Sequence, residues 1–535
     1  MSNTQVKTDT TLRSIEIIRL IIAVTLIMAA GWGIRGAFGH SRGAAMPGAM
    51  LGLSLAVVSM RADWWRRGAI LGFLGAIGWA FAGTASYGLL VGYSQGGSWL
   101  NSAYGYAGLF IVGGLYGGIG GALLALGFTA PRSLLDKFLW PMIGIYCAWL
   151  LLEWFGLNAW SLNLYAKDPV RPFETIWLYD TLWLDAAASL LLSLILWGLV
   201  PRWREATGLT ALLSIAWFAG MAVLIWAIGL RMNPSRGDAW AGCVGMFFAF
   251  LYWYWSRNNR VATMLILYGT LAGGFGFVLG EFVQALGKAK WGPIGQFPVL
   301  QEFGYWTIME QTLGGAMGFG ISVAILRLIR GQLAAPVEDC PSSWCDAFSV
   351  FILLGVVFAF NFKTNYQAWL KLNNVSNETL ALPSGMVLSC VATGILGLLA
   401  IAIYRQRRGY LDIAPRTALG KVQLLALLMI WMVMAIYMLL PRVGLPTSLM
   451  FFAELITGTL MLLLVRNTPV IPALGSVRTA DSSHWKLGWG HAAFWVMVPV
   501  LIGGVAWMTL RLELPVKQIR FPGAALKPGL EGQGD

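Results

Sequence analysis

Charged residues are scarce in this sequence. Only 11% of its 535 residues are Asp, Glu, Lys or Arg, whereas 58% are hydrophobic, and the mean hydropathy is +0.68. An average soluble domain is roughly 25% charged, because charge covers its surface. The composition therefore excludes an ordinary soluble fold and indicates an integral membrane protein.

Histidine and cysteine are also rare, and their arrangement excludes several kinds of site. The chain has three histidines and five cysteines, with no Cys/His cluster and no repeated close spacing, so we expect no metal site, no cofactor and reduced cysteines. The net charge of +13 comes from Lys and Arg in short loops beside apolar runs. That placement is typical of membrane topology, and no nucleic-acid partner is expected.

Hydrophobic runs of membrane-crossing length dominate what is present. They predict an all-α, polytopic helical bundle of about fifteen transmembrane helices, each near the roughly twenty residues that a bilayer core requires. The runs lie at 18–38, 44–60, 68–93, 104–128, 138–157, 176–200, 209–229, 239–255, 261–286, 304–328, 346–362, 381–403, 422–440, 446–465 and 488–510.

The loops between these runs alternate in basic content. Basic residues gather at one set of loops, such as 61–67 and 405–421, whereas the loop at 94–104 has none. By the positive-inside bias, this predicts a cytoplasmic N-terminus in a bacterial inner membrane. An odd number of spans puts the basic C-terminal tail outside, which is the unfavourable side. One of the last three runs is therefore also read as a segment that does not cross.

Four short segments recur in the same order, offset by about 190 to 204 residues. The clearest pair is GIRGAFGHSRGAAMPG (33–48) and GLRMNPSRGDAWAG (229–242). The others pair 86–93 with 274–281, 104–120 with 303–320, and 175–185 with 379–389. Six runs per copy imply two parallel repeats. The expected parts are an N-terminal tail (1–16), repeat 1 (17–206), repeat 2 (207–408), a basic cytoplasmic linker (409–421), three further helices (422–510) and a C-terminal tail (511–535).

This layout resembles that of the major facilitator transporters, which carry a loop of the form Gly-x-Leu-Ala-Asp-Arg-x-Gly-Arg-Arg between helices two and three. RADWWRRGA (61–69) occupies that loop, and SRNNRVA (256–262) the matching loop of the second copy. Asp63, Arg66 and Arg67 are similar to the acid and the terminal basic pair of the motif. The first glycine is missing, Trp64 follows the acid, and the second copy has no acid. The resemblance implies two six-helix halves and secondary transport.

The paired segments also suggest a binding site. Glycine-interrupted helices at matching positions of both halves are where repeat transporters bind substrate, and exposed N–H groups beside arginine suit a carboxylate or phosphate. The residues expected to contact an anionic solute are Arg35, His40, Arg42, Arg231 and Arg236. The alternative is that both segments are outer-face turns whose arginines reach lipid headgroups.

Acids within apolar runs are the other candidates, since burying a carboxylate is costly. Glu281, Glu310 and Asp185 are predicted to bind a coupling proton or Na⁺; the alternative is a structural Arg/Glu pair. The glycine series at 113–121 is read as a close-packing helix face.

The leading hypothesis is a secondary transporter of a small anionic solute, with membrane lipids, the solute and a coupling H⁺ or Na⁺ as partners. One alternative is a membrane-embedded transferase acting on a lipid-linked or acyl substrate, with His40 and an acid as base. The other is a structural or assembly subunit of a larger membrane complex.

Overall fold

The protein is a bundle of helices of membrane-spanning length. The computed structural model describes residues 14–38, 40–166, 182–232, 239–330, 344–357, 445–463 and 489–515, with short pieces at 335–336, 397, 401, 405 and 519–521. Every regular element in these ranges is a helix. Eight helices of the described part are long and apolar enough to cross a membrane.

The long helices and their short extensions are α1 (Ser14–Arg35), α6 (Trp99–Thr129), α7 (Arg132–Trp154), α10 (Leu182–Leu199), η2 (Pro201–Trp203), α11 (Arg204–Gly220), η3 (Met221–Ala227), α13 (Arg260–Lys288), α16 (Tyr305–Arg330) and α22 (Trp489–Leu510). Shorter elements are η1 (Gly36–Phe38), α2 (His40–Val58), α3 (Ala62–Trp65), α4 (Gly68–Ala82), α5 (Gly88–Ser94), α8 (Leu157–Ala166), α12 (Ala239–Trp255), α14 (Gly292–Gln296), α15 (Pro298–Phe303), α17 (Trp344–Phe351), η4 (Ile352–Val356) and α21 (Leu445–Leu463).

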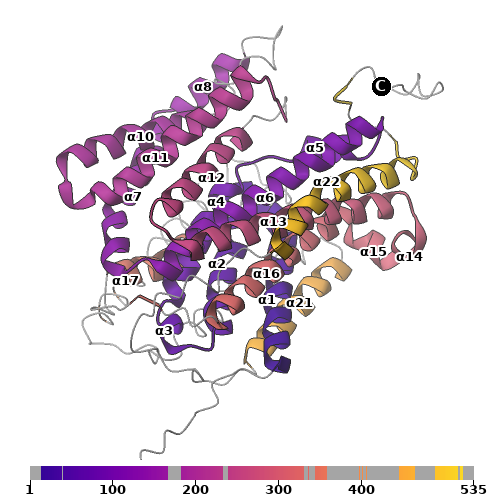
Figure 1. Ribbon diagram of the computed structural model, residues 1–535, viewed down its shortest axis with the longest axis horizontal. Coiled ribbons are helices and arrows are strands. Elements are labelled where there is room, and N and C mark those ends of the chain that lie inside the picture. Colours follow the sequence, from indigo (N-terminus) through magenta and orange to yellow (C-terminus); the bar gives the residue numbers. More distant parts are fainter. Residues whose placement is uncertain are drawn as a thin grey trace, which may run out of the picture.

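Helices α6 and α13 cross at the centre of the bundle, backbone against backbone (Figure 1). A Cβ atom added to Gly117 would lie 1.9 Å from the Gly269 carbonyl oxygen, and one added to Gly113 would lie 2.3 Å from that of Gly273. The contacts run in opposite sequence order, so the two helices are antiparallel. The glycine series at 113–121 is thus confirmed as a close-packing face, because only residues without a side chain allow this approach.

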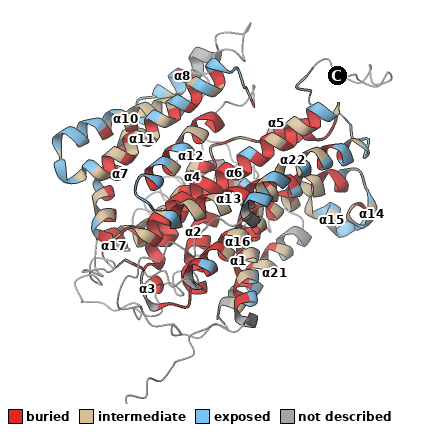
Figure 2. Ribbon diagram, viewed as in Figure 1, coloured by how far each residue is buried: buried red, intermediate tan, exposed pale blue. Residues whose placement is uncertain are grey.

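The other helices surround this centre. Helix α16 packs between α13 and α1, α21 lies against α1, and the hairpin of α2 and α4 packs on α6. Helices α7, α8, α10 and α11 form an outer layer (Figure 1). The residues of the central helices are mostly buried, and exposed residues are most frequent on the outer helices (Figure 2). Large apolar side chains such as Trp154 and Leu199 are exposed on that layer, as expected of residues that contact lipid.

Two departures from regular helix position the site. The run at 68–93, predicted as one span, is broken: α4 ends at Ala82 and α5 begins at Gly88. The break falls at GTASY, where glycine and small polar residues are poor helix formers. The glycine stretch at 31–43 also interrupts a helix, since α1 ends at Arg35 and a single 3₁₀ turn leads into α2. Both breaks lie beside α16, because Tyr87 and Gly36 each lie next to Glu310 of that helix.

Candidate functional site

Arg35, the last residue of α1, is a fully buried cation. Its Nη2 donates a 2.8 Å hydrogen bond to the hydroxyl of Tyr87 and lies 3.6 Å from Oε1 of Glu310. The side chains of Arg35 and Glu310 are 0% and 3% exposed. Removing either charge from water costs several kcal/mol, and the opposite charge of the other residue offsets part of that cost.

Tyr87 joins the two charges. It is the N-cap residue of α5, and it reaches the site because the chain breaks between α4 and α5. Its hydroxyl accepts from Arg35 and donates to Glu310 Oε1. The single proton of the hydroxyl is therefore used in the bond to Glu310, and the two charges on either side orient the group.

Glu310 lies on α16 and uses its two oxygens unequally. Oε1 accepts from Tyr87 and from the indole nitrogen of Trp306 at 3.2 Å. Within the described part of the chain, Oε2 has no hydrogen-bond partner. This oxygen lies 3.6 Å from the position that a Cβ of Gly36 would occupy, and Gly36 is exposed. The carboxylate thus has one engaged oxygen and one that faces the exposed glycine turn.

Aromatic rings enclose the guanidinium. Its central carbon lies 4.4 Å from the ring centre of Trp32, 5.5 Å from that of Tyr87 and 5.8 Å from that of Tyr116. Ring faces attract a cation, and they do so more strongly where water is excluded. The arrangement holds a positive charge at the end of α1 and leaves Glu310 as its anionic neighbour.

A second buried carboxylate, Glu281, lies on α13 and is completely buried. Its Oε1 accepts from Ser94 Oγ at 2.9 Å and from Gln95 Nε2 at 2.8 Å. Gln95 Nε2 also donates to Gln284 Oε1 at 2.9 Å. Lys288 Nζ lies 3.1 Å from the side-chain oxygens of both Gln95 and Gln284. We call these five side chains the Glu281 cluster.

A third acid, Glu454 on α21, contacts the residue next to Glu310. Gln311 Nε2 donates to its Oε2 at 3.0 Å. The same α21 packs on α1, where Phe451 lies against Gly33. Two consecutive residues of α16 therefore face different polar partners, Glu310 toward Arg35 and Gln311 toward α21.

The structure separates other predicted site residues from Arg35. The Arg231 carbonyl accepts from Tyr104 of α6 at 3.1 Å, whereas Arg35 lies beside Tyr116 of the same helix. Twelve residues of α-helix span about 18 Å, so Arg231 is at another level of the bundle. Asp185 lies in the outer layer on α10, where its carbonyl accepts from Trp149 of α7 at 2.9 Å. His40 and Arg42 fall in the first turn of α2, but their side chains, like the whole of Arg236, lie outside the described residues.

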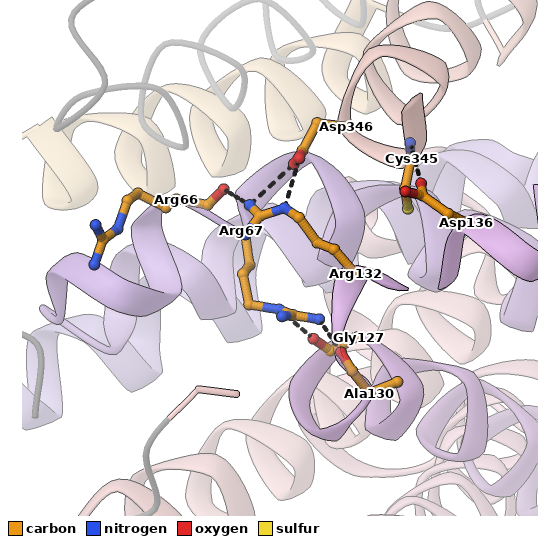
Figure 3. Close-up of polar contacts among 8 residues, drawn as sticks. All are labelled: Arg66, Arg67, Gly127, Ala130, Arg132, Asp136, Cys345 and Asp346. Carbon is orange, nitrogen blue, oxygen red and sulfur yellow. Dashed lines mark hydrogen bonds and ion pairs between the residues drawn. The ribbon is translucent and has the colours of Figure 1, made fainter. Parts of the chain in front are cut away.

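The loop that resembles the facilitator motif forms a separate cluster where α6 ends, with Arg67 bonded to the carbonyls of Gly127 and Ala130 (Figure 3). Arg67 donates to the Gly127 and Ala130 carbonyls at 2.8 and 2.5 Å, which satisfies main-chain acceptors left open where α6 ends. Arg132 donates to the Arg66 carbonyl at 3.0 Å and pairs with Asp346 of α17 at 2.5 Å. Asp63 pairs with Arg61. These charges join helix ends to one another.

No family model, curated protein or solved structure matches this chain. The site must therefore be interpreted from its own chemistry.

Tyr87, Trp306 and Gln95 are site residues that the sequence did not single out. All three lie in or beside apolar runs, where aromatic residues are common and carry no distinguishing pattern. The one available signal was the GTASY interruption of the run at 68–93, since a break inside a span often marks a binding site.

Proposed function

We propose that this protein is a secondary transporter of a small anionic solute, coupled to a cation, in a bacterial inner membrane with its N-terminus in the cytoplasm. The proposal includes the full layout of about fifteen spans, with parallel repeats at 17–206 and 207–408. The observation that carries it is the buried pair of Arg35 and Glu310, in which a fully buried guanidinium lies 3.6 Å from a carboxylate oxygen.

The pair supplies a simple exchange of counter-ions. Buried Arg35 needs a negative charge beside it. While Glu310 is ionised it fills that role, and an approaching anion is repelled. When a cation, H⁺ or Na⁺, neutralises Glu310, that repulsion is removed, and a solute carboxylate or phosphate can form a strong bidentate pair with the guanidinium. Anion and cation then bind together, which is the condition for their joint movement.

The geometry also favours an approach from the glycine turn. Gly36 is exposed and lies beside the unengaged Oε2 of Glu310. Opposite, the rings of Trp32 and Tyr116 cover the guanidinium. An anion arriving past η1 would meet Glu310 first, so loading depends on the charge of that carboxylate.

A binding experiment tests the site before the solute is known. Purified protein is heated with each member of a panel of small carboxylates, phosphates and sulfonates, and the unfolding temperature is measured. A ligand of the folded state raises that temperature. We expect a rise with at least one anion, lost in Arg35→Gln and kept in Arg257→Gln, where the arginine is exposed at 42%. A rise that survives Arg35→Gln would contradict the proposed site.

Flux measurements then test the function. In proteoliposomes, the identified anion should enter with an accompanying H⁺ or Na⁺, and Arg35→Gln should abolish this entry. Chemical conversion of a lipid-linked or acyl substrate without net solute movement would instead establish the embedded transferase. If the pure protein moves and converts no solute, and it is needed only for the assembly of a larger membrane complex, it is an assembly subunit.

A further inference from the structure

We propose that Glu281 is a proton-binding site, open to the aqueous side at which Lys288 lies, and that it takes a proton rather than a metal cation. This extends the proposed function by naming the coupling ion and its place, but its test needs no transported solute.

The free oxygen of Glu281 is the starting observation. Both donors to this carboxylate, from Ser94 and Gln95, reach Oε1. Oε2 is buried and without a hydrogen-bond partner among the described residues. A buried carboxylate oxygen left without a donor is costly. Adding a proton to the carboxyl group removes its charge and most of that cost.

The surrounding oxygens do not suit a metal ion. Hard cations bind about six oxygen ligands, yet the two side-chain amide oxygens beside Glu281 are already engaged. Gln95 Oε1 accepts from Lys288, and Gln284 Oε1 accepts from both Lys288 and Gln95. Within the described residues, no group of three His, Cys, Asp or Glu side chains could hold a metal.

Lys288 connects the cluster to water. It is the last residue of α13 and is exposed, while its Nζ bonds to Gln95 and Gln284. Gln95 in turn donates to Glu281. A continuous line of polar groups therefore runs from the surface to the buried carboxyl, and this is the expected route for proton exchange.

Among the residues that the structure describes, the groups that face Glu281 from neighbouring helices add no second acid. From α6, Tyr106 interacts with it electrostatically, and the Tyr106 hydroxyl is bonded to Thr509 of α22. From α16, the Met309 main chain packs against Gly280. From α13 itself comes Lys288. The cluster is neutral with Glu281 ionised and positive once Glu281 is protonated.

Protonation at Glu281 also bears on the Arg35 site, because α5 connects the two. Ser94 and Gln95, at its C-terminal end, hold Glu281, and Tyr87, at its N-terminal end, holds Arg35 and Glu310. Neutralising Glu281 weakens the bonds at one end of this helix. The other end carries the hydroxyl that bridges Arg35 and Glu310.

Infrared difference spectroscopy of the protein in liposomes tests the proposal directly. A protonated carboxyl has a C=O stretching band that shifts in D₂O and disappears as pH rises. We expect such a band in the wild type, missing in Glu281→Gln and present in Glu310→Gln. Gln95→Leu keeps the carboxyl but removes a donor to Oε1, so the same band should move to higher frequency even if Glu281→Gln fails to fold.

Two further results complete the test. In Lys288→Gln the band should persist to higher pH, because the ammonium that favours the ionised carboxyl is gone. Replacing K⁺ by Na⁺ at constant pH should leave the spectrum unchanged. Absence of a Glu281-dependent band across the pH range, or a carboxylate band that changes with Na⁺, would overturn the proposal. If no anion binds at Arg35 in the unfolding experiment, the proposed function fails but the proton site at Glu281 still stands.

Discussion

Tyr87 and Gln95 lie at opposite ends of the seven-residue helix α5, and each donates a hydrogen bond to a different buried glutamate. Seven residues of α-helix span about 10 Å. Two carboxylates on α16 and α13 are therefore held by one rigid element. We therefore expect a change in charge at one of them to act on the helix that positions the other.

The Arg35–Glu310 pair predicts a non-additive effect on stability. Arg35→Gln should lower the free energy of unfolding by about 3–5 kcal/mol, because it leaves Glu310 buried without its counter-ion. The double variant Arg35→Gln/Glu310→Gln removes both charges and should recover most of that loss. Denaturant unfolding in detergent provides the measurement. Equal losses in the single and double variants would show that the charges do not interact.

The bridging hydroxyl gives a milder prediction. Tyr87→Phe keeps the ring against Phe277 and Trp306 but removes one donor from Glu310 and one acceptor from Arg35. A loss of about 1–3 kcal/mol is expected from unmade buried hydrogen bonds. The control is Tyr104→Phe, in which a half-buried hydroxyl donates to the main-chain carbonyl of Arg231, with an expected loss of about 0.5–1.5 kcal/mol. Thermal unfolding of both variants distinguishes the two values.

The crossing of α6 and α13 should tolerate no side chain. Gly117→Val would place Cβ 1.9 Å from the Gly269 carbonyl oxygen, forcing two backbones apart. We expect a loss of at least about 1–3 kcal/mol and poor recovery of monodisperse protein in gel filtration. Gly198→Ala in α10 meets no atom within 4 Å and should be neutral or stabilising by up to about 1 kcal/mol. Similar behaviour of the two variants would contradict the observed packing.

The ion pair between Arg132 and Asp346 should control access to Cys345. This cysteine is 7% exposed, and its main-chain nitrogen donates to Asp136 of α7 at 2.8 Å (Figure 3). Asp346→Asn in a protein lacking the other four cysteines should loosen α17 and speed the reaction of Cys345 with maleimide. Arg257→Gln serves as the control and should leave the rate unchanged. An unchanged rate in Asp346→Asn would show that other contacts hold α17.

Sided labelling checks the predicted topology. Cysteines introduced at Arg66 and at Glu302, both exposed positions, should lie on opposite sides of the membrane. In whole cells, an impermeant maleimide should react with the Glu302→Cys protein and reach the Arg66→Cys protein only after lysis. The reverse pattern would place the N-terminus outside.

Apolar helices and close-packing glycines could be predicted from the sequence because both depend on local residue type. A run of twenty apolar residues has few other stable environments, and glycines four apart line one face of a helix. That Arg35, Glu281 and Glu310 need polar partners was also predictable, since a charge within an apolar run is costly wherever its partner lies.

The partners of those charges were decided by the tertiary structure alone. Tyr87 and Glu310 are 223 residues apart in the chain, and nothing local to either residue names the other. The position of Arg231 was also decided by the tertiary structure. Arg231 shares a sequence pattern with Arg35, but it lies beside Tyr104 of α6, whereas Arg35 lies beside Tyr116. The sequence determined which residues must be buried and which buried residues need a partner, because the free energy of burying a side chain depends on its residue type. Which pairs form depends on how helices cross, and that is set by packing between segments distant in sequence.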